Sequence, residues 1–100
     1  KKDILGLSLS TLTDELREQL ELDAKASGLV VQSVDEKSQA FEKGLRAGDI
    51  ITEAGQEPVI QISDFEARIA AAKEAGRKSL LLLVRRAGDP RFVALGLADN

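Results

Sequence analysis

The chain has 100 residues, 43% of them hydrophobic and 31% charged, which suits one globular domain with one core. Its 14 basic and 17 acidic residues give a net charge of −3, which argues against a nucleic-acid-binding face. Because histidine and cysteine are absent, Ser-His-Asp and Cys-His catalysis, disulfides and the commonest zinc ligand are excluded.

Two further absences bear on the origin of the chain. No apolar run approaches the roughly 20 residues of a membrane span, and no signal peptide is visible. Methionine is missing even from position 1. We therefore expect the chain to be a piece excised from a longer protein.

The first third of the chain alternates between strand and helix patterns. After a polar and frayed start at residues 1–3, alternating leucines predict a half-buried strand over residues 4–12. Thr13 is expected to cap a helix in which Leu12, Leu16 and Leu20 share one face and which stops by about Leu22. A loop follows over 23–28, and the apolar run 29–34 predicts a central strand.

Glycines separate the next elements. Ser38 is expected to cap a short helical turn over 39–43, with Phe41 pointing inward and Gly44 ending the turn in the left-handed conformation. Gly48-Asp49 predicts a turn that also needs a positive φ at Gly48 and that leads into a buried strand over 50–54. Residues 55–58 then turn the chain back.

The last third predicts one helix and two strands. Ser63 and Glu66 form a capping box for a helix that reaches about Ala75 and ends at Gly76. Its apolar face carries Phe65, Ile69 and Ala72. Strands are expected over 80–84 and 91–97, separated by a turn at 88–90, and the basic pairs 77–78 and 85–86 are interpreted as flanking solvated strand ends.

Peptide binding is the best-supported chemistry, because nothing indicates catalysis by this chain. Acidic pairs such as Asp14-Glu15 read as solvated faces, no serine has a histidine partner, and no phosphate-binding loop, metal ligand set or cofactor motif occurs. If the first strand and the helix over 64–75 lie side by side, an extended peptide could pair with the strand edge. Gly6, between Leu5 and Leu7, would then supply N–H groups for a carboxylate. On residues alone, an ordinary strand glycine is the commoner interpretation.

Several motifs together resemble a known family. The segments Gly28-Leu29-Val30-Val31-Gln32-Ser33-Val34, Ser38-Gln39-Ala40-Phe41 and Gly44-Leu45-Arg46-Ala47-Gly48-Asp49-Ile50-Ile51 resemble PDZ domains, in the permuted form attached to HtrA (Deg/Do) serine proteases. The resemblance covers residues 4–97 of a single domain spanning 1–100. The ending over 91–95 resembles the second, C-terminal PDZ domain of alphaproteobacterial Do-type proteases.

The resemblance implies a fold, a location and a site. The fold would be α+β, mostly β: a partly open barrel of five or six strands with two main helices and a short helical turn. The parent would be a periplasmic serine endopeptidase. In the family, a loop matching Ile4-Leu5-Gly6-Leu7 binds the ligand carboxylate, and the ligand pairs antiparallel with the following strand. The candidate peptide-binding residues are Ile4, Leu5, Gly6, Leu7, Ser8, Leu9, Phe65, Ile69 and Ala72.

Two functions remain open at this point. The first is a module that recognises C-termini or extended segments of unfolded proteins, favoured by the intact Leu5-Gly6-Leu7 loop. The second is a structural module that packs against the protease domain, other PDZ domains or other subunits, favoured by the small Ala72. Phe65 and Ile69 fit either groove or core, because sequence does not fix the rotation of the helix.

Overall fold

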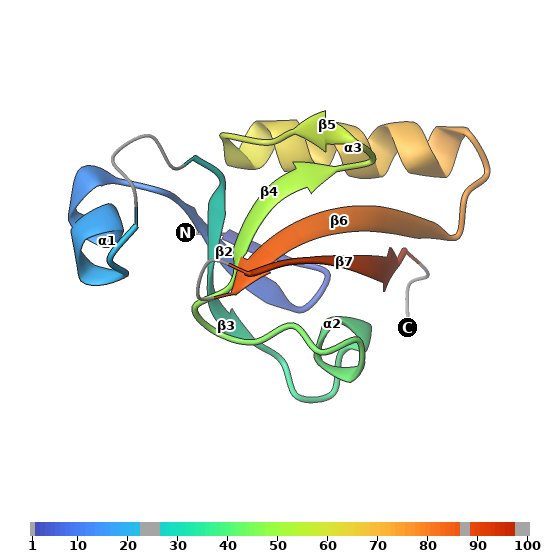
Figure 1. The fold of residues 1–100 in the computed structure, drawn as a ribbon. Coiled ribbons are helices and arrows are strands. Elements are labelled where there is room, and N and C mark those ends of the chain that lie inside the picture. Colours follow the sequence, from blue (N-terminus) through green and yellow to red (C-terminus); the bar gives the residue numbers. More distant parts are fainter. Residues whose placement is uncertain (1, 23–26, 87–88, 98–100) are drawn as a thin grey trace.

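The computed structural model describes residues 2–22, 27–86 and 89–97, which form a curled antiparallel sheet with three helices around it (Figure 1). The strands are β1 (Lys2–Ile4), β2 (Leu7–Thr11), β3 (Leu29–Val34), β4 (Ile50–Ala54), β5 (Glu57–Pro58), β6 (Ser79–Arg86) and β7 (Asp89–Gly96). The helices are α1 (Asp14–Gln19), α2 (Gln39–Glu42) and α3 (Ile62–Glu74). Six strands follow the order β1-β2-β3-β4-β6-β7, and β5 pairs with β4 beside this path. The predicted mostly-β, partly open barrel is confirmed.

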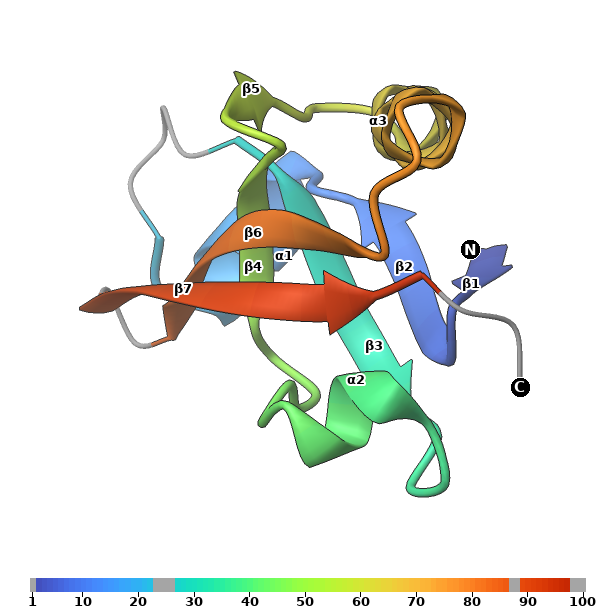
Figure 2. The ribbon, with the colours of Figure 1, turned by 90° about the vertical axis from the view of Figure 1, so that its right-hand side faces the viewer.

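The core lies inside the curl of the sheet and under α3. Along β6, Leu80, Leu82 and Val84 are buried, while the intervening Leu81 is exposed, as period two requires. Phe65, Ile69 and Ala72 of α3 are also buried, so the predicted apolar face of this helix is confirmed. Figure 2 shows α3 nearly end-on above the sheet, beside the outer part that β2 and β1 form. None of the helices in the described ranges is long and apolar enough to cross a membrane.

The N-terminal segment differs from its prediction. Instead of one strand over 4–12, it forms a hairpin in which β1 pairs with β2 through the contacts Lys2↔Leu9, Asp3↔Ser8 and Ile4↔Leu7. The two turn residues have positive φ, 52° at Leu5 and 84° at Gly6, as in the mirror-image turns that suit β-hairpins. Lys2 and Asp3, expected to be frayed, therefore belong to a strand, and Lys1 lies outside the described residues.

The first two helices are short and capped as predicted. The Leu16 amide donates to Oγ1 of Thr13 at 3.2 Å, and the Phe41 amide donates to Oγ of Ser38 at 3.3 Å. Helix α1 ends at Gln19, before the predicted limit, and buries none of its residues. Of the loop expected over 23–28, residues 23–26 lie outside the described ranges.

In α2 the inward residue is Ala40 rather than the predicted Phe41. Ala40 is fully buried and accepts a hydrogen bond from the Leu45 amide, which folds Leu45 back into the core. Phe41 is half-buried, and its ring lies 3.7 Å from the guanidinium carbon of Arg46. The aromatic ring is therefore used for a cation–π contact at the surface.

Helix α3 starts earlier than the predicted box of Ser63 and Glu66. Gln61 is the N-cap, and the carboxylate of Asp64 accepts hydrogen bonds from the amides of Gln61 and Ile60, both at 3.0 Å. These two bonds lower the pKa of Asp64, because they favour the charged carboxylate. At the other end, Gly76 has φ 77°, as a helix-ending glycine should.

The last strand begins before its predicted start. Asp89 and Pro90, expected in a turn, belong to β7, and Pro90 pairs with Arg85; Gly88 lies outside the described residues. Proline is tolerated there because β7 is an edge strand of the sheet. The strands β3 and β4 occupy the predicted ranges 29–34 and 50–54.

The loop before β4 holds an ion pair that was not predicted, between the buried Asp49 and the half-buried Arg86. Asp49 is only 1% exposed, and its carboxylate accepts hydrogen bonds from Nε and Nη2 of Arg86, both at 2.8 Å, and from the Arg46 amide at 2.9 Å. Arg86 also donates to the carbonyl of Gly44 at 2.6 Å. The hydrogen bonds to Asp49 raise the pKa of Arg86. Arg86 is thus a structural residue and not a solvated strand end.

Candidate functional site

The outer edge of β2 carries the backbone groups that a pairing peptide would need. The carbonyl of Gly6 accepts a hydrogen bond from the Asp35 amide at 2.8 Å, toward β3. Because the carbonyl and the next N–H of a peptide unit point in opposite directions, the N–H of Leu7 points away from β3. The regular β1–β2 register, in which Ile4 lies opposite Leu7 and Lys2 opposite Leu9, gives the N–H of Leu9 the same direction. These groups lie on the edge of β2 along which β1 pairs.

A cleft of about 300 Å³ lies between this edge region and α3. It brings together three of the candidate residues, Ile4, Leu5 and Ile69. Three further residues of α3 that sequence reasoning did not name complete the lining: Glu66, Ala70 and Lys73. They occupy the helical stripe next to Phe65, Ile69 and Ala72, so the neighbouring i, i+4, i+7 pattern was the signal that could have revealed them.

The side chains of the other candidates lie outside this cleft. Leu7, Leu9 and Phe65 are fully buried in the core. Ser8 is 5% exposed, and its Oγ has no hydrogen-bond partner within the described part of the chain. The side chains of these residues therefore do not line this cleft, whereas Leu7 and Leu9 offer their backbone N–H groups to a pairing strand.

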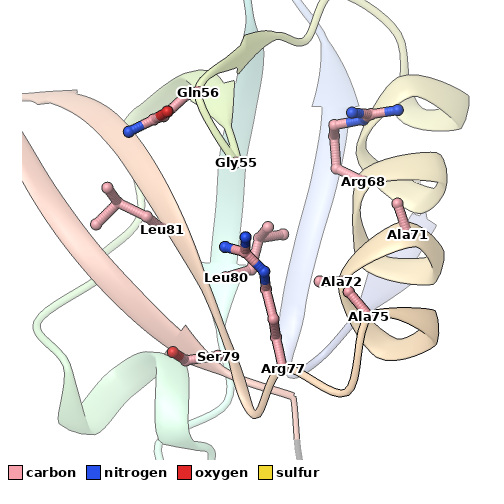
Figure 3. A pocket seen from close by; sticks show the side chains of 10 residues that line it. All are labelled: Gly55, Gln56, Arg68, Ala71, Ala72, Ala75, Arg77, Ser79, Leu80 and Leu81. Atoms are coloured by element: carbon pink, nitrogen blue, oxygen red, sulfur yellow. The ribbon is translucent and has the colours of Figure 1, made fainter.

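Ala72 lines a different cleft, of about 480 Å³, on the opposite side of α3 (Figure 3). In this second cleft the Arg77 side chain extends between Leu80 and α3, and Ala71 and Ala75 face it from the helix. The small size of Ala72 therefore does not shape the cleft beside Ile4 and Leu5.

Gly6 cannot be replaced without distortion in this conformation. Its φ of 84° lies in the left-handed region, and a Cβ added there would collide with the side chain of Ser38. Leu5 before it has φ 52°, a conformation that costs energy for a residue with a side chain. The loop that the resemblance assigns to the carboxylate is thus a tight hairpin turn here.

A family model described as PDZ domain matches residues 4–95. The chain belongs to the PDZ domain family. This agrees with the resemblance drawn from the three sequence segments and with the curled sheet and flanking helices.

Proteases of the HtrA type are prominent among similar proteins. The chain is 46% identical over 68 residues to a probable periplasmic serine endoprotease, DegP-like, of Bartonella henselae, and 32% identical over 90 residues to one of Rickettsia conorii. These matches cover 68% and 90% of the PDZ chain, but only 14% and 17% of the relatives. The chain therefore spans a small part of the length of these relatives.

Solved PDZ structures share the fold. The structure of the HtrA3 PDZ domain bound to a phage-derived ligand, FGRWV, matches with a TM-score of 0.77 and 27% identity, over 95% of this chain and 84% of that one. The HtrA-type protease AlgW with a decapeptide matches with a TM-score of 0.70 and 25% identity, over 93% of this chain and 28% of that one.

Proposed function

We propose that this PDZ domain binds the C-terminal segment of an extended or unfolded polypeptide by strand addition to β2, and that it serves a periplasmic serine endopeptidase of the HtrA type. The observation that carries the proposal is a cleft lined by Ile4, Leu5 and α3, in a domain whose β2 directs the N–H groups of Leu7 and Leu9 away from β3. Main-chain pairing would supply affinity, and the cleft would select side chains.

The similar proteins support both halves of the proposal. The relatives of Bartonella henselae and Rickettsia conorii are named as periplasmic serine endoproteases. The HtrA3 PDZ domain and the protease AlgW were each solved with a peptide. We assign no catalytic role to the PDZ chain itself, so cleavage would belong to the remainder of such a protein.

The test is a titration of the chain with the peptide FGRWV, followed by amide chemical shifts in NMR spectra. A free carboxylate accepting backbone N–H bonds is worth on the order of 1.5–3 kcal/mol, so we expect the amidated peptide to bind about ten- to hundredfold more weakly. Equal affinity for the acid and the amide would refute recognition of the C-terminus and leave binding of internal segments.

A matched pair of variants on α3 tests the location of the groove. Ala70 and Ala71 are adjacent, exposed alanines that line the two opposite clefts. We expect Ala70→Lys to weaken binding, since a charged side chain would fill the cleft beside Ile4, and Ala71→Lys to leave affinity unchanged. The reverse result would move the peptide to the cleft around Arg77. The buried Ile69 is a poor choice for this test, because a lysine there would threaten the core.

The second function, a structural module, is favoured by an exposed apolar patch on the outer face of β6 and β7. Phe92 is 67% exposed and pairs with Leu83, while Leu81 is 39% exposed and pairs with Ala94. An apolar patch of this kind marks interaction surfaces. If this patch packs against another domain or subunit, Phe92→Ser should weaken the assembly of the complete parent protein, measured as a lower oligomeric mass in analytical ultracentrifugation. The same variant should leave FGRWV binding intact.

A further inference from the structure

We propose that β1 is an internal competitor for the peptide, so that Lys2–Ile4 must leave the edge of β2 before a ligand can pair there. This inference rests on the proposed function and adds its regulation. The site would be closed in the resting domain and opened by release of β1.

The sheet order supplies the first step of the argument. β1 is the terminal strand of the sheet and pairs with β2, whose other neighbour is β3. The edge of β2 that carries the outward groups of Leu7 and Leu9 is therefore occupied by β1. A ligand strand and β1 would need the same hydrogen-bonding groups.

The register supplies the second step. β1 runs antiparallel to β2, in the direction proposed for the ligand, and Ile4 lies opposite Leu7. An antiparallel peptide whose carboxylate reaches the Gly6 loop would place its last residue opposite Leu7 as well. Ile4 therefore occupies the position of the terminal residue of the ligand.

Side-chain packing supplies the third step. Ile4 and Leu5 are half-buried, pack against the core and line the cleft beside Ile69. The segment thus blocks the backbone edge and also contributes apolar side chains to the space beside α3.

Two features of β1 make its pairing with β2 weak. β1 has only three residues, two of them charged, and as the terminal strand of the sheet it pairs with β2 on one side only. Its turn forces Leu5 into the left-handed region, which costs energy whenever β1 is docked. Because the domain is open only part of the time, the apparent dissociation constant of the ligand equals the intrinsic constant divided by the open fraction.

The experiment compares the full chain with a variant that lacks residues 1–3 and carries an acetylated N-terminus, so that no new charge lies beside the carboxylate loop. Ile4, Leu5, Gly6 and Leu7 all remain. With an open fraction near one tenth, the variant should bind FGRWV about tenfold more tightly. Unchanged or weaker affinity in the variant would overturn the inference.

Hydrogen exchange provides a readout that needs no ligand. In the full chain the amide of Leu9, which lies opposite Lys2, should exchange slowly, and in the variant it should exchange at least about tenfold faster, since residue 2 is absent. The Val31 amide, which donates to the carbonyl of Asp49 at 2.9 Å, should stay protected in both and report an intact fold. Equal exchange at Leu9 in the two chains would also overturn the inference.

A proline pair repeats the test at constant chain length. The alternation of the β1–β2 ladder directs the amide of Lys2 toward β2 and that of Asp3 away from it. Lys2→Pro should therefore raise affinity and exchange at Leu9 more than Asp3→Pro does; equal effects would contradict pairing by β1. If no chain binds FGRWV in acid form, the proposed function fails, while the exchange data still decide whether β1 covers the edge.

Discussion

Replacement of Arg86 by methionine offers a sharp test of the ion pair that anchors the loop before β4. Methionine keeps much of the aliphatic length of arginine but donates no hydrogen bonds. Asp49 would then lose both bonds from the guanidinium and keep the one from the Arg46 amide. The carboxylate would remain buried without a countercharge.

The magnitude follows from burial on the two sides of the pair. Removing one partner of a fully buried ion pair costs about 3–5 kcal/mol. Asp49 is 1% exposed, but the Arg86 side chain is 39% exposed, so water can partly replace the guanidinium. We therefore expect Arg86→Met to lower the free energy of unfolding by about 2–3 kcal/mol.

Urea unfolding followed by circular dichroism at pH 7 measures this change, and Arg91→Met is the control. Arg91 is an exposed arginine on the neighbouring strand β7, and its replacement should change stability by less than about 0.5 kcal/mol. Adding Asp49→Asn to Arg86→Met should recover part of the loss, since the uncompensated charge disappears. Equal effects of the two arginine variants, or no recovery in the double variant, would refute the account.

Three further changes probe other parts of the fold. Gly48 has φ 95°, and an added Cβ would meet no residue other than its two chain neighbours within 4 Å, so Gly48→Val should cost about 1–3 kcal/mol through backbone strain. Asparagine tolerates this conformation, so an equally large loss for Gly48→Asn would argue against strain. Ser8→Ala should be neutral or stabilising by up to about 1 kcal/mol in urea unfolding, because the Ser8 hydroxyl has no partner in the described structure; a clear loss would reveal one. The pKa of Asp64 is lower in the folded state than its ordinary value of 3.8, so its contribution is present above that value and lost as pH falls through the folded pKa. Asp64→Ala should accordingly lower the thermal midpoint at pH 7, and this difference should shrink in acid; a difference independent of pH would contradict the cap.

The parts of the fold that were predicted well depend on short-range rules. The strands β3 and β4 begin with apolar residues shortly after Gly28 and Gly48, and both glycines have positive φ. At Gly28 a Cβ would come within 2.5 Å of the Ile51 carbonyl oxygen, so a glycine is also required by the neighbouring strand. In such places the residue type fixes the element boundary.

The hairpin at the N-terminus escaped prediction because its turn leaves only one weak signal in the sequence, Gly6. A two-residue turn preserves the alternation of residues, so Leu5, Leu7 and Leu9 read as one continuous strand. Leucine is also rare with a positive φ, and nothing local marks Leu5 as a turn residue. The pairing of β1 with β2 is needed to hold it there.

The cleft and the start of α3 were only partly predictable. Gln61 with Asp64 and Ser63 with Glu66 both have the spacing of a capping box, and local rules do not rank them. The sequence likewise predicts which three residues of α3 are buried, but it does not say whether the neighbouring stripe with Ala70 and Lys73 lines a cleft or faces solvent. The packing of Phe65, Ile69 and Ala72 in the core fixes the rotation of the helix.

The ion pair of Asp49 and Arg86 also has a consequence for folding kinetics. It joins residues 37 positions apart, across the register in which Ile50 pairs with Arg85, so it closes only after β4 and β6 have met. The β6–β7 ladder, by contrast, connects neighbours in sequence and belongs to the kind of hairpin that forms in about 1–10 μs. A late contact changes the unfolding rate more than the folding rate. The pair should therefore slow unfolding and lengthen the lifetime of the native domain, with little effect on the folding rate.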